Sequence, residues 1–106
     1  MAITNVTVGI TTTQLFLSPT NTEQAVTTMF FCNTSAATDA TIDIYVTPGG
    51  QAVGTSNQII KSLPLPKSET FVFDAEKIIL ESGDSINAVA SVGNIIVATI
   101  SSVQTS

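Results

Sequence analysis

Histidine, the side chain that serves most often as a general base and as a metal ligand, is absent from this chain. A serine or cysteine nucleophile would therefore need another base. The only cationic candidates are Lys61, Lys67 and Lys77, and none of them stands in a Ser-x-x-Lys sequence. No glycine-rich segment joins a strand to a helix, as a phosphate-binding loop would. We expect no enzymatic activity and no cofactor.

The carboxylates Asp74, Glu76, Glu81 and Asp84 lie close together in the sequence, and clusters of oxygen ligands can bind Ca²⁺. Their spacing matches no calcium-binding loop. Solvation of the surface is therefore the better interpretation, and no metal site is predicted. Asp84 directly follows a glycine, and we expect Asp84 to cap this tight turn through its own backbone.

The single cysteine, Cys32, excludes an intramolecular disulfide, so the fold must be stable without one. It ends the apolar run Met29-Phe30-Phe31-Cys32. That position favours a buried, unreactive thiol that packs as a small hydrophobic group.

Composition places the chain among small associating proteins. Its 106 residues suffice for one domain but not two. Charged residues make up only 10% of the chain, against roughly 25% in an average soluble domain. Such a shortage of charge is typical of surfaces that are covered by other subunits. A neutral monomer kept soluble by threonine and serine remains the alternative interpretation.

The net charge of −5 and the absence of arginine argue against nucleic acid as a partner. Residues 1–10 show no basic segment followed by an apolar one, and no apolar run approaches the ~20 residues that span a bilayer. We therefore expect neither a signal peptide nor a membrane partner, and synthesis in a cytoplasm.

Alternating apolar and polar residues dominate the chain and predict strands. The clearest alternation covers Thr38–Thr47 and Ile86–Val92, whereas Ala25–Asn33 is apolar on both faces and predicts a strand covered on both sides. We expect seven to nine strands and no long helix, in one antiparallel β-sandwich over residues 1–106, of jelly-roll or immunoglobulin-like topology, with a short N-terminal arm over about residues 1–8. The other expected strands are Ile3–Ile10, Thr11–Leu17, Ile59–Leu63, Ser68–Phe73, an extended segment near 78–80 and Ile95–Val103.

Two connecting segments stand out. Pro48–Asn57 lacks periodicity and holds three of the six glycines, so it predicts a loop that is either a contact loop or simply flexible. Pro64 and Pro66 remove two backbone donors, which confines the segment to a sheet edge or to an extended loop.

Three stretches of the sequence resemble a group of small β-sandwich proteins of tailed bacteriophages, notably those that infect cyanobacteria. The matching features are a CNTS strand end, an LExGDxI turn and, between them, a loop that reads VTPGG here where the group has VxPxGG, one residue longer; the similarity covers roughly residues 24–103. The resemblance implies a virion structural protein and no catalytic residues. The three stretches are Cys32–Gly50, Ser56–Asp74 and Glu76–Ser91.

The resemblance favours a capsid decoration (cement) protein that binds the outer surface of the major capsid protein shell and stabilises it. A tail, baseplate or fibre-associated subunit is the alternative, and a carbohydrate-binding module is less favoured because the chain has no Trp and one Tyr. The partners would be the major capsid protein or other virion subunits. Localisation would be the virion, assembled in the host bacterial cytoplasm.

We also expect self-association into dimers or trimers, because a sandwich with so little charge at its edges otherwise risks uncontrolled pairing. The N-terminal arm could add a strand to a neighbour, and the Pro48–Asn57 loop could contact one. The candidate interface residues are Ile3, Asn5, Val6, Val8, Pro48, Gly49, Gly50, Gln51, Val53 and Asn57.

Overall fold

The structure, a computed structural model, describes residues 2–73 and 78–104. These residues form strands and one 3-10 turn, η1 (Thr55–Asn57). The strands are β1 (Ala2–Val8), β2 (Thr13–Leu17), β3 (Gln24–Asn33), β4 (Ala40–Thr47), β5 (Gln58–Leu65), β6 (Thr70–Phe73), β7 (Ile78–Leu80), β8 (Ser85–Ala90) and β9 (Ile96–Gln104).

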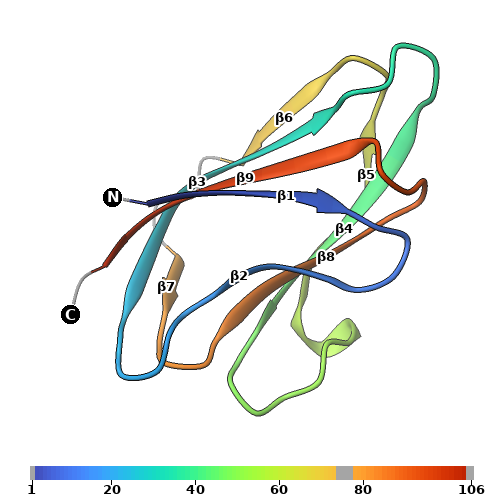
Figure 1. Cartoon of the computed structure of the whole chain (residues 1–106). Helices are drawn as coiled ribbons and strands as arrows, with labels where there is room; N and C mark the ends of the chain where they lie inside the picture. The colour runs from blue at the N-terminus through green and yellow to red at the C-terminus, as the bar shows by residue number, and fades with distance from the viewer. Residues whose placement is uncertain (1, 74–77, 105–106) are drawn as a thin grey trace.

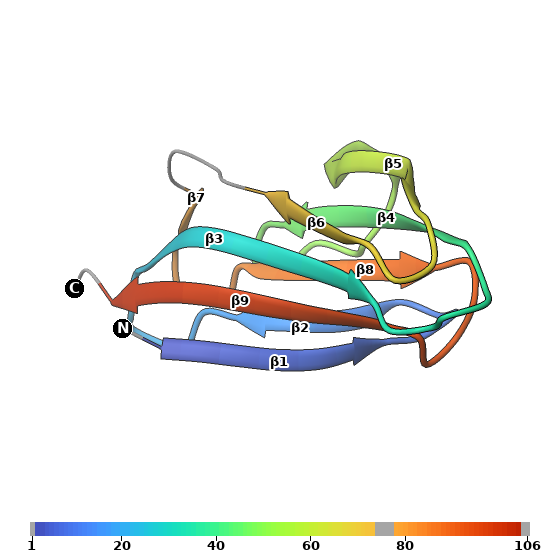
Figure 2. The same cartoon turned by 90° about the horizontal axis from the view of Figure 1, so that it is seen from above.

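The strands form two antiparallel sheets, and the predicted β-sandwich is confirmed (Figures 1 and 2). The five-stranded sheet has the order β1-β9-β3-β6, with the short β7 also paired to β3. The four-stranded sheet has the order β2-β8-β4-β5. Strand β5 lies at a sheet edge, which is one of the two positions that its prolines allow.

The pairing is nested: β4 pairs with β5, β3 with β6 and β7, β2 with β8, and β1 with β9. One long hairpin whose tip is the β4–β5 connection gives this order when it is rolled into two layers. That arrangement is a jelly roll. The structure thus decides between the two topologies that the sequence left open.

The core lies between the sheets and consists of the side chains that strand alternation turns inward. Strand β4 supplies Ala40, Ile42 and Ile44, and β8 supplies Ile86, Ala88 and Ala90, as the sequence predicted. The five-stranded sheet contributes larger groups to the same cluster, among them Met29, Phe31, Ile96 and Ile100. Small residues in β8 therefore face bulky ones across the core.

A buried amide joins the two sheets at one end of the core. Asn33, at the end of β3, is 1% exposed. Its Nδ2 donates to the carbonyl oxygens of Leu65 (2.8 Å) and Thr38 (2.9 Å), and its Oδ1 accepts from the Ser35 N–H (3.0 Å). All its hydrogen-bonding groups are thus engaged, which a buried amide requires.

The N-terminal segment is not a projecting arm. Residues 2–8 pair along their whole length with β9, so β1 is an edge strand of the five-stranded sheet. Its one unpaired edge remains open to solvent or to another chain.

Candidate interaction surfaces

The outer face of the five-stranded sheet is a set of cross-strand rows, because residues directly opposite each other point to the same side of a sheet. Strand register defines the rows, and the burial of Met29, Phe31, Ala98 and Ile100 shows that the alternate residues face the core. The rows are Thr7-Val97-Cys32-Thr70, Asn5-Thr99-Phe30-Val72, Ile3-Ser101-Thr28 and Val103-Ala25-Ile79. We call these residues the outer face.

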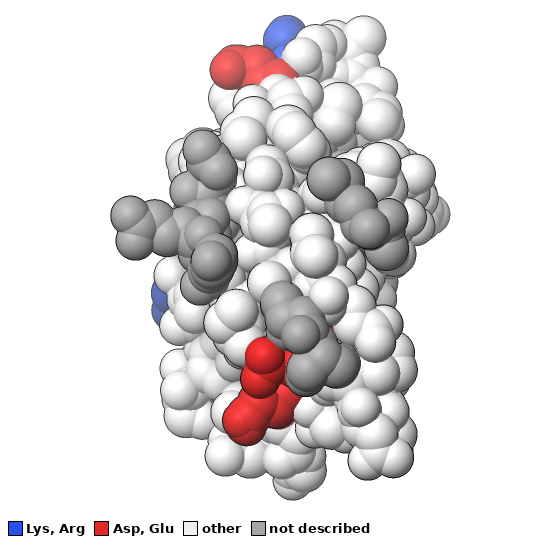
Figure 3. All heavy atoms as spheres, turned by 90° about the vertical axis from the view of Figure 1, so that its left-hand side faces the viewer, with Lys and Arg blue, Asp and Glu red and all other residues white. Residues whose placement is uncertain are grey.

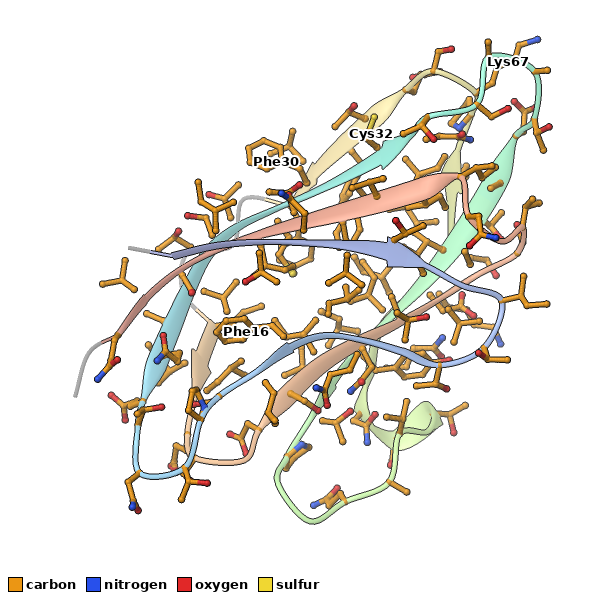
Figure 4. The ribbon with its side chains drawn as sticks, viewed as in Figure 1. Phe16, Phe30, Cys32 and Lys67 are labelled. Carbon is orange, nitrogen blue, oxygen red and sulfur yellow. The ribbon has the colours of Figure 1, made fainter. Side chains whose placement is uncertain are left out.

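The outer face is uncharged and combines apolar side chains with Thr, Ser and Asn. Five of its large apolar side chains are 37% to 67% exposed, namely Ile3, Phe30, Val72, Ile79 and Val103, whereas Val97 is half-buried. In Figure 4, Phe30 projects from β3 clear of the ribbons of the four-stranded sheet. No Lys, Asp or Glu belongs to the rows. The charged side chains of the described residues lie instead in β4, β5 or connecting segments, namely Glu23, Asp39, Asp43, Lys61, Lys67, Glu69, Glu81 and Asp84.

Figure 3 shows the end of the molecule where β1 starts and β9 finishes. The acidic side chains visible there form two small groups near the top and the bottom of the view, and most of the described surface between them is uncharged. The sparse charge of the sequence is thus also unevenly placed.

Polar groups on the outer face bond to one another within the sheet. The Thr99 hydroxyl donates to Oδ1 of Asn5 (2.7 Å). Thr27 occupies the β-bulge of β3, and its hydroxyl donates to the carbonyl oxygen of Ser101 (3.3 Å) and lies 3.4 Å from the Ser101 hydroxyl. Covering these groups would cost less free energy than covering unpaired ones.

Two sequence predictions about β3 are corrected here. The strand was expected to be covered on both sides, but within one chain only its Met29–Phe31 side packs on the core, while Phe30 is exposed. Cys32 was expected to be buried, but its thiol is half-buried on the outer face. The apolar residues on both sides of β3 are the sequence feature that indicates the outer face. The predicted interface nevertheless included no residue of β3.

The outer side of the four-stranded sheet is different in kind. Its polar side chains hold the sheet itself: Oδ1 of Asp43 accepts from the Ser62 N–H (2.6 Å), where Ser62 has a left-handed φ of 53°. Asn87, 4% exposed, donates to the hydroxyls of Thr47 (3.2 Å) and Ser85 (3.0 Å). Exposed Leu17 and Ile59 lie on the two opposite edge strands and form no continuous patch.

The Pro48–Asn57 loop is held in shape by two side chains. Oδ1 of Asp84 accepts a hydrogen bond from the Gly49 N–H (2.7 Å). Gly49 also packs closely on Gly83, so that a Cβ added at Gly49 would lie 3.2 Å from the carbonyl carbon of Gly83. Oδ1 of Asn57 accepts from the Gly54 N–H (3.3 Å), and its Nδ2 donates to the Ala52 carbonyl oxygen (3.0 Å). The loop is therefore exposed but internally bonded.

The predicted interface residues fall into separate groups. Val8 is fully buried in the core, and Val6 packs against it, so neither is available as predicted. Ile3 and Asn5 lie on the outer face. The loop residues come from the other sheet: Pro48, Gly49, Gly50 and Gln51 are exposed, Val53 is half-buried, and Asn57 bonds within the loop. The structure does not bring the two regions together.

The acidic cluster acts as a turn cap where it can be described. Oδ2 of Asp84 accepts from the Glu81 N–H (2.9 Å), and its other oxygen holds the loop. Asp74 and Glu76 lie outside the described residues. Within residues 2–73 and 78–104, no group of three or more Cys, Asp or Glu side chains is placed to hold a metal ion.

A shallow pocket of about 280 Å³ lies at the end of the four-stranded sheet, between Asp39, Thr41, Pro64, Pro66 and Ser91. Two of its polar groups are already engaged. Oδ1 of Asp39 accepts from the Lys67 N–H (2.9 Å), and the Ser91 hydroxyl accepts from the Thr41 N–H (2.8 Å). The pocket therefore presents few groups that could orient a ligand.

No described segment forms a helix with the length and apolar character needed to cross a bilayer. Comparison of the chain with protein-family models, curated protein sequences and solved structures finds no match. The class of the protein therefore rests on its own architecture: an antiparallel jelly-roll sandwich with one uncharged outer face that exposes large apolar side chains.

Proposed function

We propose that this protein is a bacteriophage virion structural protein, most simply a capsid decoration protein that binds the outer surface of the major capsid protein shell and stabilises it. The sequence resemblance to small phage sandwich proteins motivates the proposal. The observation that supports an associating subunit, as distinct from its shell contact, is the outer face, where five large apolar side chains remain exposed on a fold whose core is already complete. Such a surface is typical of a subunit that works by association.

The fold is compatible with this role. Jelly rolls occur in viral capsid domains, although they also occur in lectins and cupins. This support is an analogy at the level of the fold and does not itself assign a function. Cupin-type metal chemistry would need ligands such as histidine, which this chain lacks.

The Pro48–Asn57 loop is the surface that we assign to the shell. It is exposed at the β4–β5 connection, and Asp84 and Asn57 fix its shape. A loop that is ordered before binding loses little conformational entropy when it binds. It also carries no charged side chain, so contact would not require an ion pair to be desolvated.

Counting the protein in purified virions tests the proposal. A decoration subunit should be present in numbers on the order of hundreds per particle, because shell symmetry repeats its site many times. A count of about six or about twelve would instead indicate the tail or baseplate. Absence of the protein from purified particles would refute a virion role altogether.

The carbohydrate-binding alternative has little support among the described residues. Sugar platforms usually present exposed aromatic rings. The exposed ring of Phe30 has no polar atom to bind a sugar hydroxyl and no neighbouring Trp, which the chain lacks. The single Tyr45 is half-buried, and its hydroxyl lies 3.5 Å from Nε2 of Gln58.

A further inference from the structure

We infer that the outer face is a self-association surface, on which a second copy of this chain packs face to face about a two-fold axis. The inference rests on the proposed function, because it assumes a subunit that works by association. It assigns a second copy of the chain to the outer face and leaves the Pro48–Asn57 loop free for another partner.

The first argument is charge. Each chain carries −5, yet the outer face contributes none of this charge among the described residues. A surface without charge cannot select a partner by electrostatic complementarity. It can meet an identical surface without placing like charges in contact, which is the requirement of an isologous interface.

The second argument is area. Four paired strands at ~4.8 Å spacing span about 19 Å, and the nine residues of β9 extend about 30 Å at ~3.3 Å each. The flat projection of the face is thus on the order of 500 Å², and its corrugated accessible area is larger. A standard interface takes about 800 Å² from each partner. The face therefore suits a modest dimer interface and leaves little room for a larger one.

The third argument is chemistry. Paired sheets pack about 10 Å apart through interdigitating side chains, and this face offers Phe30, Val72 and Ile79 as projecting groups between smaller Thr and Ser. The Thr99–Asn5 bond already satisfies polar atoms on the β1–β9 side of the face. Strand β3 is apolar on both sides, and such strands are usually covered on both faces. A second copy would cover the side of β3 that faces away from the core.

Sedimentation velocity of the purified protein, from about 1 μM to about 1 mM, tests the inference. The wild type should shift from monomer to dimer with concentration. Phe30→Asp should raise the dimer Kd at least about thirtyfold, because it places an unpaired carboxylate at the centre of the interface. Circular dichroism and thermal unfolding would verify that each variant folds.

A matched pair of variants locates the surface. Ile79 on the outer face and Ile59 on the other sheet are 45% and 44% exposed. Ile79→Asp should weaken the dimer, whereas Ile59→Asp should leave it unchanged. If Ile59→Asp weakens the dimer equally, or if Phe30→Asp leaves it intact, the copies associate through another surface, such as the open edge of β1, and the inference is wrong.

The remaining outcomes separate this inference from the proposed function. A protein that stays monomeric throughout, or forms trimers, overturns the two-fold face. If that monomer binds particles in high copy and Phe30→Asp abolishes the binding, a shell protein covers the face, and only the proposed function survives. If the protein forms the dimer but is absent from purified virions, the self-association inference survives and the proposed function is wrong.

Discussion

The two sheets of this jelly roll share one core but have outer surfaces that differ in the groups they expose. On the four-stranded sheet, Asp43 and Asn87 direct their polar atoms to the backbone and side chains of the sheet itself. On the five-stranded sheet, Phe30 and Val72 form a cross-strand pair exposed to solvent, with no charged residue in their row. The comparison shows that the position of the uncharged surface says more about where a partner could bind than the low overall charge does.

Removal of the amide that joins the sheets should have the largest effect. Asn33→Ala leaves the buried carbonyl oxygen of Leu65 without its donor, and we expect a loss of about 2–4 kcal/mol in the free energy of unfolding. Urea denaturation measures the loss. Gln14→Ala is the matched control, because Gln14 is an exposed amide on β2 and lies outside the outer face, and it should cost less than about 0.5 kcal/mol. Equal losses in the two variants would contradict a structural role for Asn33.

Removal of the polar support of the four-stranded face should have an intermediate effect. Asp43→Ala deprives the Ser62 N–H of its acceptor, and we expect a loss of about 1–2 kcal/mol. Asp43→Asn keeps an acceptor oxygen and should lose less. The same denaturation measurement, made on the monomer at low concentration, checks both. If both variants were as stable as the wild type, the four-stranded sheet would not depend on the Asp43 hydrogen bond. The contrast between the two sheets would then be weakened.

The smallest expected effect concerns thiol accessibility. Cys32 lies half-buried on the outer face, so its rate of maleimide labelling should fall about fivefold at protein concentrations well above the dimer Kd. Val89→Cys in a Cys32→Ser background places a thiol on the four-stranded sheet, and its labelling rate should not depend on concentration. A concentration-dependent rate for Val89→Cys together with a constant rate for Cys32 would reverse the assignment of the two faces.

Sequence reasoning predicted most of the strands because their burial follows local alternation. Ile42 and Ile44 face the core, as the period of two requires. The turn around Gly83 was also predicted, and its φ of 85° explains why glycine is needed there. The cap by Asp84 was predicted locally, but its bond to Gly49 was not, since residues far apart in the sequence meet only after the sheets assemble.

Prediction of the candidate interface was less complete. Val8 was placed in an exposed arm, yet the pairing of β1 with β9 turns it into the core. Phe30 and Cys32 were recognised as apolar and expected on a strand covered on both sides, but the chain itself leaves Phe30 exposed and Cys32 half-buried. Alternation shows that a strand has two apolar sides, but it does not show how many of them the same chain can cover.

The sequence by itself determined a chain of short strands with little charge, because composition and the two-residue period are local properties. Only the tertiary structure decided that the strands nest as a jelly roll, that Asn33 bridges the two sheets, and that Phe30 and Val72 meet on an uncovered surface. The physical reason is that strand partners are chosen by long-range packing. Two residues on separate strands become neighbours only when the register of the whole sheet is fixed.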